Sequence, residues 1–144
     1  MGADLMGKIL VPAAIENLED IYAANRGQLA AEKVRKVVIP DALVDTGATG
    51  LSMPKRLIAD LGLMAFRDRP ARTSAGVVNL RIFGAVRLTV QGRECICDVT
   101  EIPDDCPVLI GQVPLELLDF VLDPRNQCLI GNPAHGGQHM IDMF

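Results

Sequence analysis

The sequence has very few aromatic residues: it contains no Trp, one Tyr and four Phe among 144 residues. Proteins that bind single-stranded nucleic acid need aromatic rings on which bases stack, and they need positive charge to meet the phosphates. The net charge of this chain is -4, so both features are missing. We therefore expect no nucleic acid partner, and we expect a core built from Val, Leu, Ile, Ala and Met.

Long apolar runs are also missing. No apolar stretch reaches the roughly 18 residues that a membrane-spanning helix requires. Residues 1–14, MGADLMGKILVPAA, do not show a basic segment followed by a long apolar run, which is the pattern of an export signal. The sequence therefore predicts a soluble, cytoplasmic protein with no membrane partner.

Cysteine is scarce, and its spacing is too uneven for a disulfide scaffold. We expect reduced thiols, with Cys95 and Cys97 packing on a strand face. His135 and His139 could suggest zinc together with Cys128, but the two glycines between them do not favour the helix that presents an i, i+4 histidine pair. We expect no metal and no cofactor. The four cysteines are Cys95, Cys97, Cys106 and Cys128.

Apolar residues are abundant, at 49% of the chain. A length of 144 residues suits one domain with its own core, and no repeat or linker-like composition marks a boundary. The sequence thus predicts a single domain over residues 1–144. The aliphatic excess also favours a buried subunit interface.

The first half of the chain predicts strands around one short helix. KILVPAA at 8–14 and KVVIPDALV at 36–44 are typical of strands. The segment 16–36 between them fits either a helix or two strands around a turn at 25–27, and we favour the hairpin. Residues 54–63, PKRLIADLGL, predict a short helix with Pro54 near its start and Gly62 after its end.

The second half alternates as strands do. Val86, Leu88 and Val90 share one strand face, and a turn at Gln91–Gly92 leads into ECICDVT. CPVLIG at 106–111 predicts a strand buried on both faces. Residues 113–121 predict a helix from the spacing of apolar side chains, and DPRNQ predicts a turn into a last strand, CLIG at 128–131. These short strands make the class mainly β. The helical spacing rests on Pro114, Leu115, Leu118 and Val121.

One turn has an unusual context. Asp45, Thr46 and Gly47 follow an apolar strand directly, Ala48 and Thr49 come next, and the hydrophobic-hydrophobic-Gly triplet 109–111 stands about sixty-five residues later. Together these features resemble the retropepsin-like aspartic proteases over roughly residues 37–123. The resemblance implies an all-β fold, a retropepsin-like acid protease half-barrel with one or two short helices.

The resemblance also implies roles for individual residues. Asp45 would be the catalytic carboxyl, Thr46 would reach across a dimer axis to the partner's loop, and Gly47 would bring its backbone amide to the carboxylate. The triplet 109–111 would pack beside the turn, and residues 73–79 would form the flap over a bound peptide. The residues implied to contact the substrate are Ala48, Thr73, Ser74, Ala75, Gly76, Val77 and Ile110.

The chemistry explains the need for a dimer. Hydrolysis of an amide without a metal or a nucleophilic side chain needs one carboxylate to activate water and a second carboxyl to protonate or polarise the carbonyl. Two adjacent carboxyls share one proton, because both cannot ionise so close together. This sequence has a single Asp-Thr-Gly, so a twofold dimer would supply the second Asp45. We expect a homodimeric aspartic endopeptidase, a hydrolase acting on peptides or proteins.

Two alternatives remain at this point. Asp45 could be a turn residue that caps its own backbone. The chain could also be a non-catalytic dimeric peptide-binding or adaptor module on the same fold, since fold does not fix function.

Overall fold

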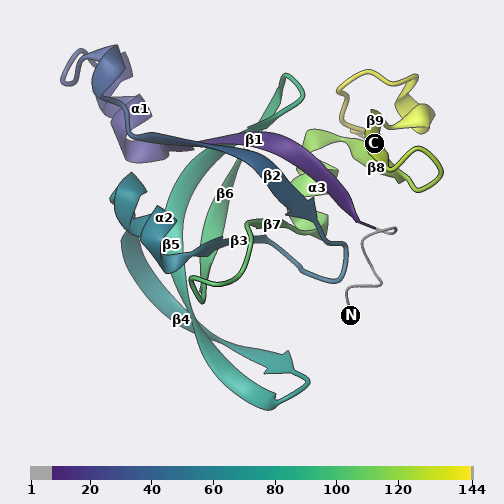
Figure 1. Cartoon of the computed structure of the whole chain (residues 1–144). Helices are drawn as coiled ribbons and strands as arrows, with labels where there is room; N and C mark the ends of the chain where they lie inside the picture. Colours follow the sequence, from purple (N-terminus) through teal and green to yellow (C-terminus); the bar gives the residue numbers. More distant parts are fainter. Residues whose placement is uncertain (1–7, 144) are drawn as a thin grey trace.

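The computed structural model describes residues 8–143 and shows a mainly β protein, with 49% of residues in strands and 21% in helices. The mainly β class predicted from the sequence is confirmed. Most strands belong to one sheet in the order β1-β2-β7-β3-β6-β5-β4 (Figure 1). Their bounds are β1 Ile9–Asn17, β2 Lys36–Val44, β3 Leu51–Pro54, β4 Met64–Thr73, β5 Gly76–Val90, β6 Arg93–Ile102 and β7 Leu109–Ile110.

The sheet closes on itself, because β1 pairs with β5 as well as with β2. β4 pairs with β5 alone and extends below the closed part as a long curved hairpin (Figure 1). The β1–β2 ladder has an irregularity between Val11 and Ala13, at Pro12, which has no N–H to donate to a ladder. The main sheet thus consists of a closed part and a projecting hairpin.

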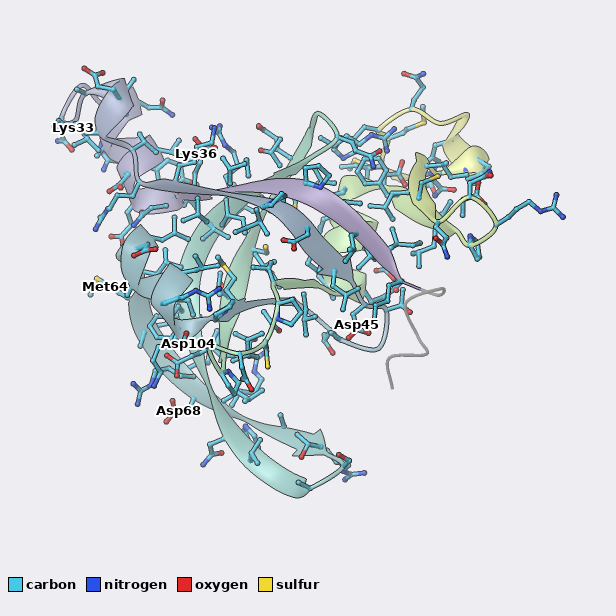
Figure 2. All side chains as sticks on the ribbon, in the orientation of Figure 1. Lys33, Lys36, Asp45, Met64, Asp68 and Asp104 are labelled. Carbon is cyan, nitrogen blue, oxygen red and sulfur yellow. The ribbon has the colours of Figure 1, made fainter. Side chains whose placement is uncertain are left out.

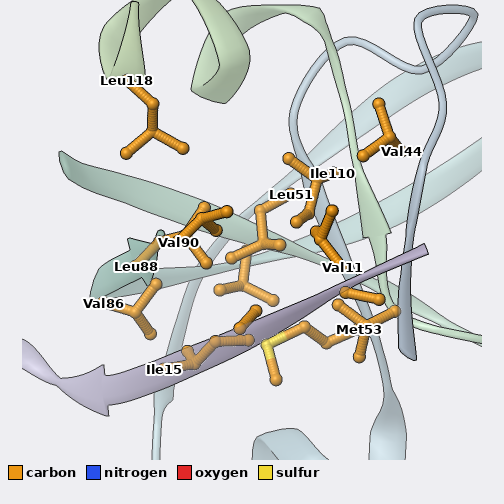
Figure 3. Close-up of a cluster of buried hydrophobic side chains, with 14 of the residues drawn as sticks. Val11, Ile15, Val44, Leu51, Met53, Val86, Leu88, Val90, Ile110 and Leu118 are labelled. Atoms are coloured by element: carbon orange, nitrogen blue, oxygen red, sulfur yellow. The ribbon is translucent and has the colours of Figure 1, made fainter. Parts of the chain in front are cut away.

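The core fills the inside of the closed sheet, where aliphatic side chains from several strands and from α3 (Gln112–Leu118) meet (Figure 3). Among its buried members, only Phe83 and Phe120 are aromatic, which confirms the predicted aliphatic core. Burying each large aliphatic side chain contributes about 1.5–3 kcal/mol. The fully buried large side chains include Ile15, Leu51, Met53, Leu88, Ile110, Leu115 and Leu118.

Several predicted elements are present with nearly the predicted bounds. β2 spans Lys36–Val44, and α2 spans Lys55–Leu61 between Pro54 and a left-handed Gly62 at φ +64°. The β5–β6 hairpin turns at Gln91 and Gly92, and it places Leu88 opposite Cys95. Cys95 and Cys97 pack against the core as predicted, and all four cysteines are free thiols.

The predicted hairpin at 16–36 is wrong, because the structure has helix α1, Leu18–Asn25, in its place. Asn17 caps this helix: its Oδ1 accepts a hydrogen bond from Asp20 N at 3.1 Å. The expected turn is the end of the helix, where Gly27 adopts φ +75° and donates to Ala24 O. The described chain therefore has three short α-helices where one or two were expected.

The segment after residue 106 also differs from the prediction. β7 is only two residues long, although it lies between β2 and β3 as a buried strand should. Helix α3 ends at Leu118, and Val121 belongs instead to β8, Phe120–Asp123, which pairs with β9, Cys128–Gly131. Asp119 ends the helix in the left-handed conformation at φ +59°. Val121 keeps the apolar spacing of α3 by coincidence, because the helix has already ended before Asp119.

None of the helices in the described part of the chain combines the length and the apolar character that a bilayer crossing requires. The sequence analysis interpreted residues 1–14 as lacking an export signal. Residues 1–7 of that segment lie outside the described residues.

Candidate active site

Asp45 stands at the end of β2, at the opposite end of this strand from Lys36 (Figure 2). The chain turns directly after it: Ala48 N donates to Asp45 O at 3.0 Å and closes a four-residue turn. The chain then runs through Thr49 and Gly50 into β3. The Asp45 turn, residues 45–48, is thus a tight connection between two strands, and its central residues, Thr46 and Gly47, are exposed.

The Asp45 turn is held by the segment 108–113. Asp45 N donates to Ile110 O at 2.9 Å, and Gln112 N donates to Ala48 O at 2.9 Å. Val113 N donates to Thr49 O at 2.8 Å. Gly111, the N-cap residue of α3, has no side chain with which to cap the helix, so the loop carbonyls satisfy two of the first N–H groups of α3. The prediction that the 109–111 triplet packs beside the turn is confirmed.

Gly111 permits this close approach. A Cβ atom at position 111 would lie 2.5 Å from Gly50 O and 2.6 Å from Ala48 O. Both are backbone atoms, so they cannot move aside as a flexible side chain would. The glycine of the triplet is therefore required by the packing of one loop on another.

The Asp45 carboxylate has one hydrogen bond within the described chain. Gly47 N donates to its Oδ1 at 2.9 Å, as predicted for Gly47 and as the backbone-capping alternative also expects. Within residues 8–143, Oδ2 has no hydrogen-bond partner, and no cation forms an ion pair with Asp45. Thr46 and Gly47 are exposed, and Asp45 is half-buried. One carboxylate oxygen is fixed and the other is available.

A cavity of about 580 Å³ lies between this loop and the β4–β5 hairpin, within the roughly 300–1,000 Å³ of typical ligand pockets. Residues 48–52 form one wall, and residues 69–73 of β4 form another. Leu80 and Ile82 of β5 and Thr100 of β6 also contribute. Asp45 itself does not line this cavity in the single described chain.

The predicted substrate-contacting residues lie in three places. Ala48 and Thr73 line the cavity. The others of the hairpin tip, residues 74–77, are exposed and do not line it, although Thr73 Oγ1 fixes the tip by donating to Gly76 O at 2.8 Å. Ile110 is fully buried and acts through its backbone carbonyl.

Sequence reasoning missed most of the cavity wall. Arg69 of β4 lies opposite Leu80 of β5, and Arg67 lies opposite Ile82, in the antiparallel ladder. The alternation of Leu80 and Ile82 along β5 is the signal that could have marked this face, because directly opposed residues share one side of a sheet.

Cys97 also lines the cavity. The pKa of its thiol is raised, by the hydrogen bond with Cys95 first and by burial second. A neutral, buried thiol is a weak nucleophile. Cys97 is therefore not an activated nucleophile.

A second polar cluster binds the C-terminal segment, residues 132–142, to Asp119. His135 Nδ1 lies 2.6 Å from Asp119 Oδ2, and His135 Nε2 lies 3.1 Å from Asp142 Oδ2. Asn132 and the backbone of Met140 also donate to Asp119. Over the part of the chain that the structure describes, no Ser, Thr or Cys side chain bonds to His135, and the hydrogen bonds of the cluster join the end of α3 to residues 132–142.

No protein-family model matches the sequence, and a search of curated proteins finds no match. The functional argument therefore depends on the site itself.

Proposed function

We propose that the chain is one subunit of a homodimeric aspartic endopeptidase on a retropepsin-like half-barrel, in which each subunit contributes Asp45. The observation that carries the proposal is the construction of the Asp45 turn. Hydrogen bonds with residues 110–113 fix the turn, whereas Oδ2 of Asp45 is unpaired within the described chain and Thr46 is exposed. A rigid turn with a free carboxylate oxygen is suited to meet an identical turn.

The chemistry of the pair follows from its symmetry. Two Asp45 carboxyls at a twofold axis hold one proton between them. The ionised carboxyl removes a proton from a water molecule, which attacks the carbonyl carbon of the scissile amide, while the protonated one donates a hydrogen bond to the carbonyl oxygen. Collapse of the tetrahedral species then breaks the C–N bond, and the leaving nitrogen takes up the proton that the first carboxyl received from water, which restores the shared-proton pair. In each subunit Gly47 N donates to Oδ1 of Asp45 and so fixes one oxygen of the carboxylate.

Exposed apolar residues beside the turn support a second subunit. Val113, which donates to Thr49 O, has 44% of its surface exposed, and Leu117 on the same helix has 48%. Large apolar side chains left exposed beside a functional loop are typical of a surface that another protein covers.

The substitution Asp45→Asn tests the proposal. It keeps the size of the side chain and its contact with Gly47 N, but it cannot accept the proton of water. We expect loss of hydrolysis of a proteome-derived peptide library, read by mass spectrometry, with an unchanged sedimentation coefficient. Asp41→Asn, at an exposed site on the same strand, is the control and should retain activity. Peptide cleavage by Asp45→Asn at the wild-type rate would refute the proposal.

One observation favours a second candidate. The cavity is complete without Asp45, so a dimeric peptide-binding or adaptor module could use it without catalysis. A wild-type protein that binds peptides but never cleaves them would support this alternative.

A further inference from the structure

One arginine side chain on the cavity wall is unpaired. Arg69 lines the cavity together with one carboxylate, Asp98. Within residues 8–143, the side chain of Arg69 forms no hydrogen bond or ion pair. Its guanidinium group is therefore free to meet a ligand, and its five-donor geometry matches a carboxylate. Arg72 also borders the cavity, but it lies three residues from Arg69 on the same strand, so its side chain belongs to the opposite face of the sheet.

The other arginines of the hairpin differ in this respect. Arg81 lies 3.8 Å from Asp68, and the two residues are opposite each other in the ladder. Arg67 stacks over the Phe66 ring at 4.7 Å. Neither Arg81 nor Arg67 lines the cavity.

The register explains why Arg69 faces inward. Arg69 is directly opposite Leu80, and Leu80 and Ile82 both line the cavity. Opposed residues in an antiparallel pair share one face, so Arg69 lies on the face that carries these apolar side chains. The cavity therefore combines an apolar floor with an unpaired arginine.

We propose that this cavity binds an extended peptide through an acidic side chain, Asp or Glu, that pairs with Arg69. Apolar neighbours of that acidic residue would contact Leu80 and Ile82. The inference rests on the proposed function, because it describes the peptide specificity of the proposed protease site. It concerns binding, so it can be tested apart from hydrolysis.

The test uses two fluorescein-labelled decapeptides, one alternating Leu with Glu and one alternating Leu with Gln. Binding is measured by fluorescence anisotropy with the Asp45→Asn protein, which keeps both peptides intact under the proposed function. We expect the Glu peptide to bind about tenfold more tightly, the change that corresponds to one charge-assisted hydrogen bond. The preference should weaken in high salt.

Single substitutions identify the residue that causes the preference for the Glu peptide. Arg69→Gln should abolish it, whereas two controls should leave it unchanged: Arg72→Gln, on the opposite face of β4, and Arg81→Gln, outside the cavity. Equal affinity for the two peptides, or binding of neither, would overturn the inference. If Arg69→Gln lost the preference and its dimer also dissociated in sedimentation, the inference would be overturned as well, because Arg69 would then face the partner subunit.

The two proposals fail separately. If wild-type protein cleaves the peptide library but Asp45→Asn protein binds both decapeptides equally, only the acidic preference is refuted. If wild-type protein binds the Glu peptide preferentially but cleaves nothing, the enzymatic proposal is refuted and the acidic preference stands.

Discussion

Gly111 is the residue on which the position of the Asp45 turn depends most directly. A Cβ atom there would clash with backbone atoms of residues 48–50. Gly50, on the other side of the same contact, has no atom within 4 Å of an added Cβ. One contact thus contains a glycine that the packing requires and a glycine that it does not.

This difference gives a matched prediction. Gly111→Ala should lower the free energy of unfolding by about 1–3 kcal/mol, the usual cost of overpacking, and should reduce peptide hydrolysis by displacing the Asp45 turn. Gly50→Ala should be close to wild type in both respects. Urea unfolding and activity measured side by side check this, and equal effects of the two substitutions would contradict the packing described here.

Asp119 and His135 form a pair of interacting titratable groups in the C-terminal segment. The hydrogen bond with His135 is the main cause that lowers the pKa of Asp119 from 3.8 to about 2. Asp119 first, and Asp142 second, raise the pKa of His135 above its ordinary 6.5. The contribution of Asp119 to stability is therefore lost as the pH falls from 3.8 towards 2, and that of His135 is lost as the pH rises above 6.5.

The urea midpoint of the wild-type protein should accordingly decrease between pH 6 and pH 9. In His135→Gln this alkaline decrease should be smaller, because the group that loses its proton is gone. His139→Gln, which changes the other histidine, should behave as wild type. The same decrease in all three proteins would show that the Asp119–His135 contact does not control stability in this range.

Among the elements, α1 shows why the local sequence pattern was insufficient to predict a helix rather than a hairpin. The sequence at 16–36 fits two structures, and the choice depends on Asn17, which is 1% exposed. Its Nδ2 donates to Leu61 O at 2.8 Å, and its Oδ1 accepts from Asp20 N. The contact with Leu61, 44 residues away, joins α1 to the end of α2. No local propensity reports such a contact.

Asn17→Ala should lower the free energy of unfolding by about 2 kcal/mol, since it removes a helix cap and leaves the Leu61 carbonyl without its donor. Asn25→Ala, at the exposed end of the same helix, is the control and should change it by less than about 0.5 kcal/mol. Chemical denaturation followed by circular dichroism measures both. If the two variants were equally stable, Asn17 would not be the residue that selects the helix.

Other elements were predictable because their signals are local. α2 has Pro54 and Gly62 at its ends, and the β5–β6 hairpin has strict alternation around Gln91–Gly92. The Asp45 turn and its contact with Gly111 were also predictable, since a motif marks each. The cavity wall was not, because it joins β3, β4, β5 and β6 through pairings that no single segment encodes.

At the scale of the whole molecule, a single chain carries one half of the proposed catalytic pair. The specific activity per chain should therefore fall on dilution, once the concentration drops below the dimer dissociation constant. Hydrolysis rates measured over a dilution series, alongside sedimentation velocity, check this. An active species that sediments as a monomer would contradict the proposal.

Mixed dimers test the central claim most directly. Wild-type and Asp45→Asn chains are unfolded together, refolded at a constant total concentration and assayed for peptide hydrolysis as the wild-type fraction varies. If each active site needs Asp45 from both subunits, a mixed dimer is inactive, and the activity should follow the square of the wild-type fraction. Activity that falls in direct proportion to the wild-type fraction would show that one Asp45 is sufficient, and the two-carboxyl mechanism would be wrong.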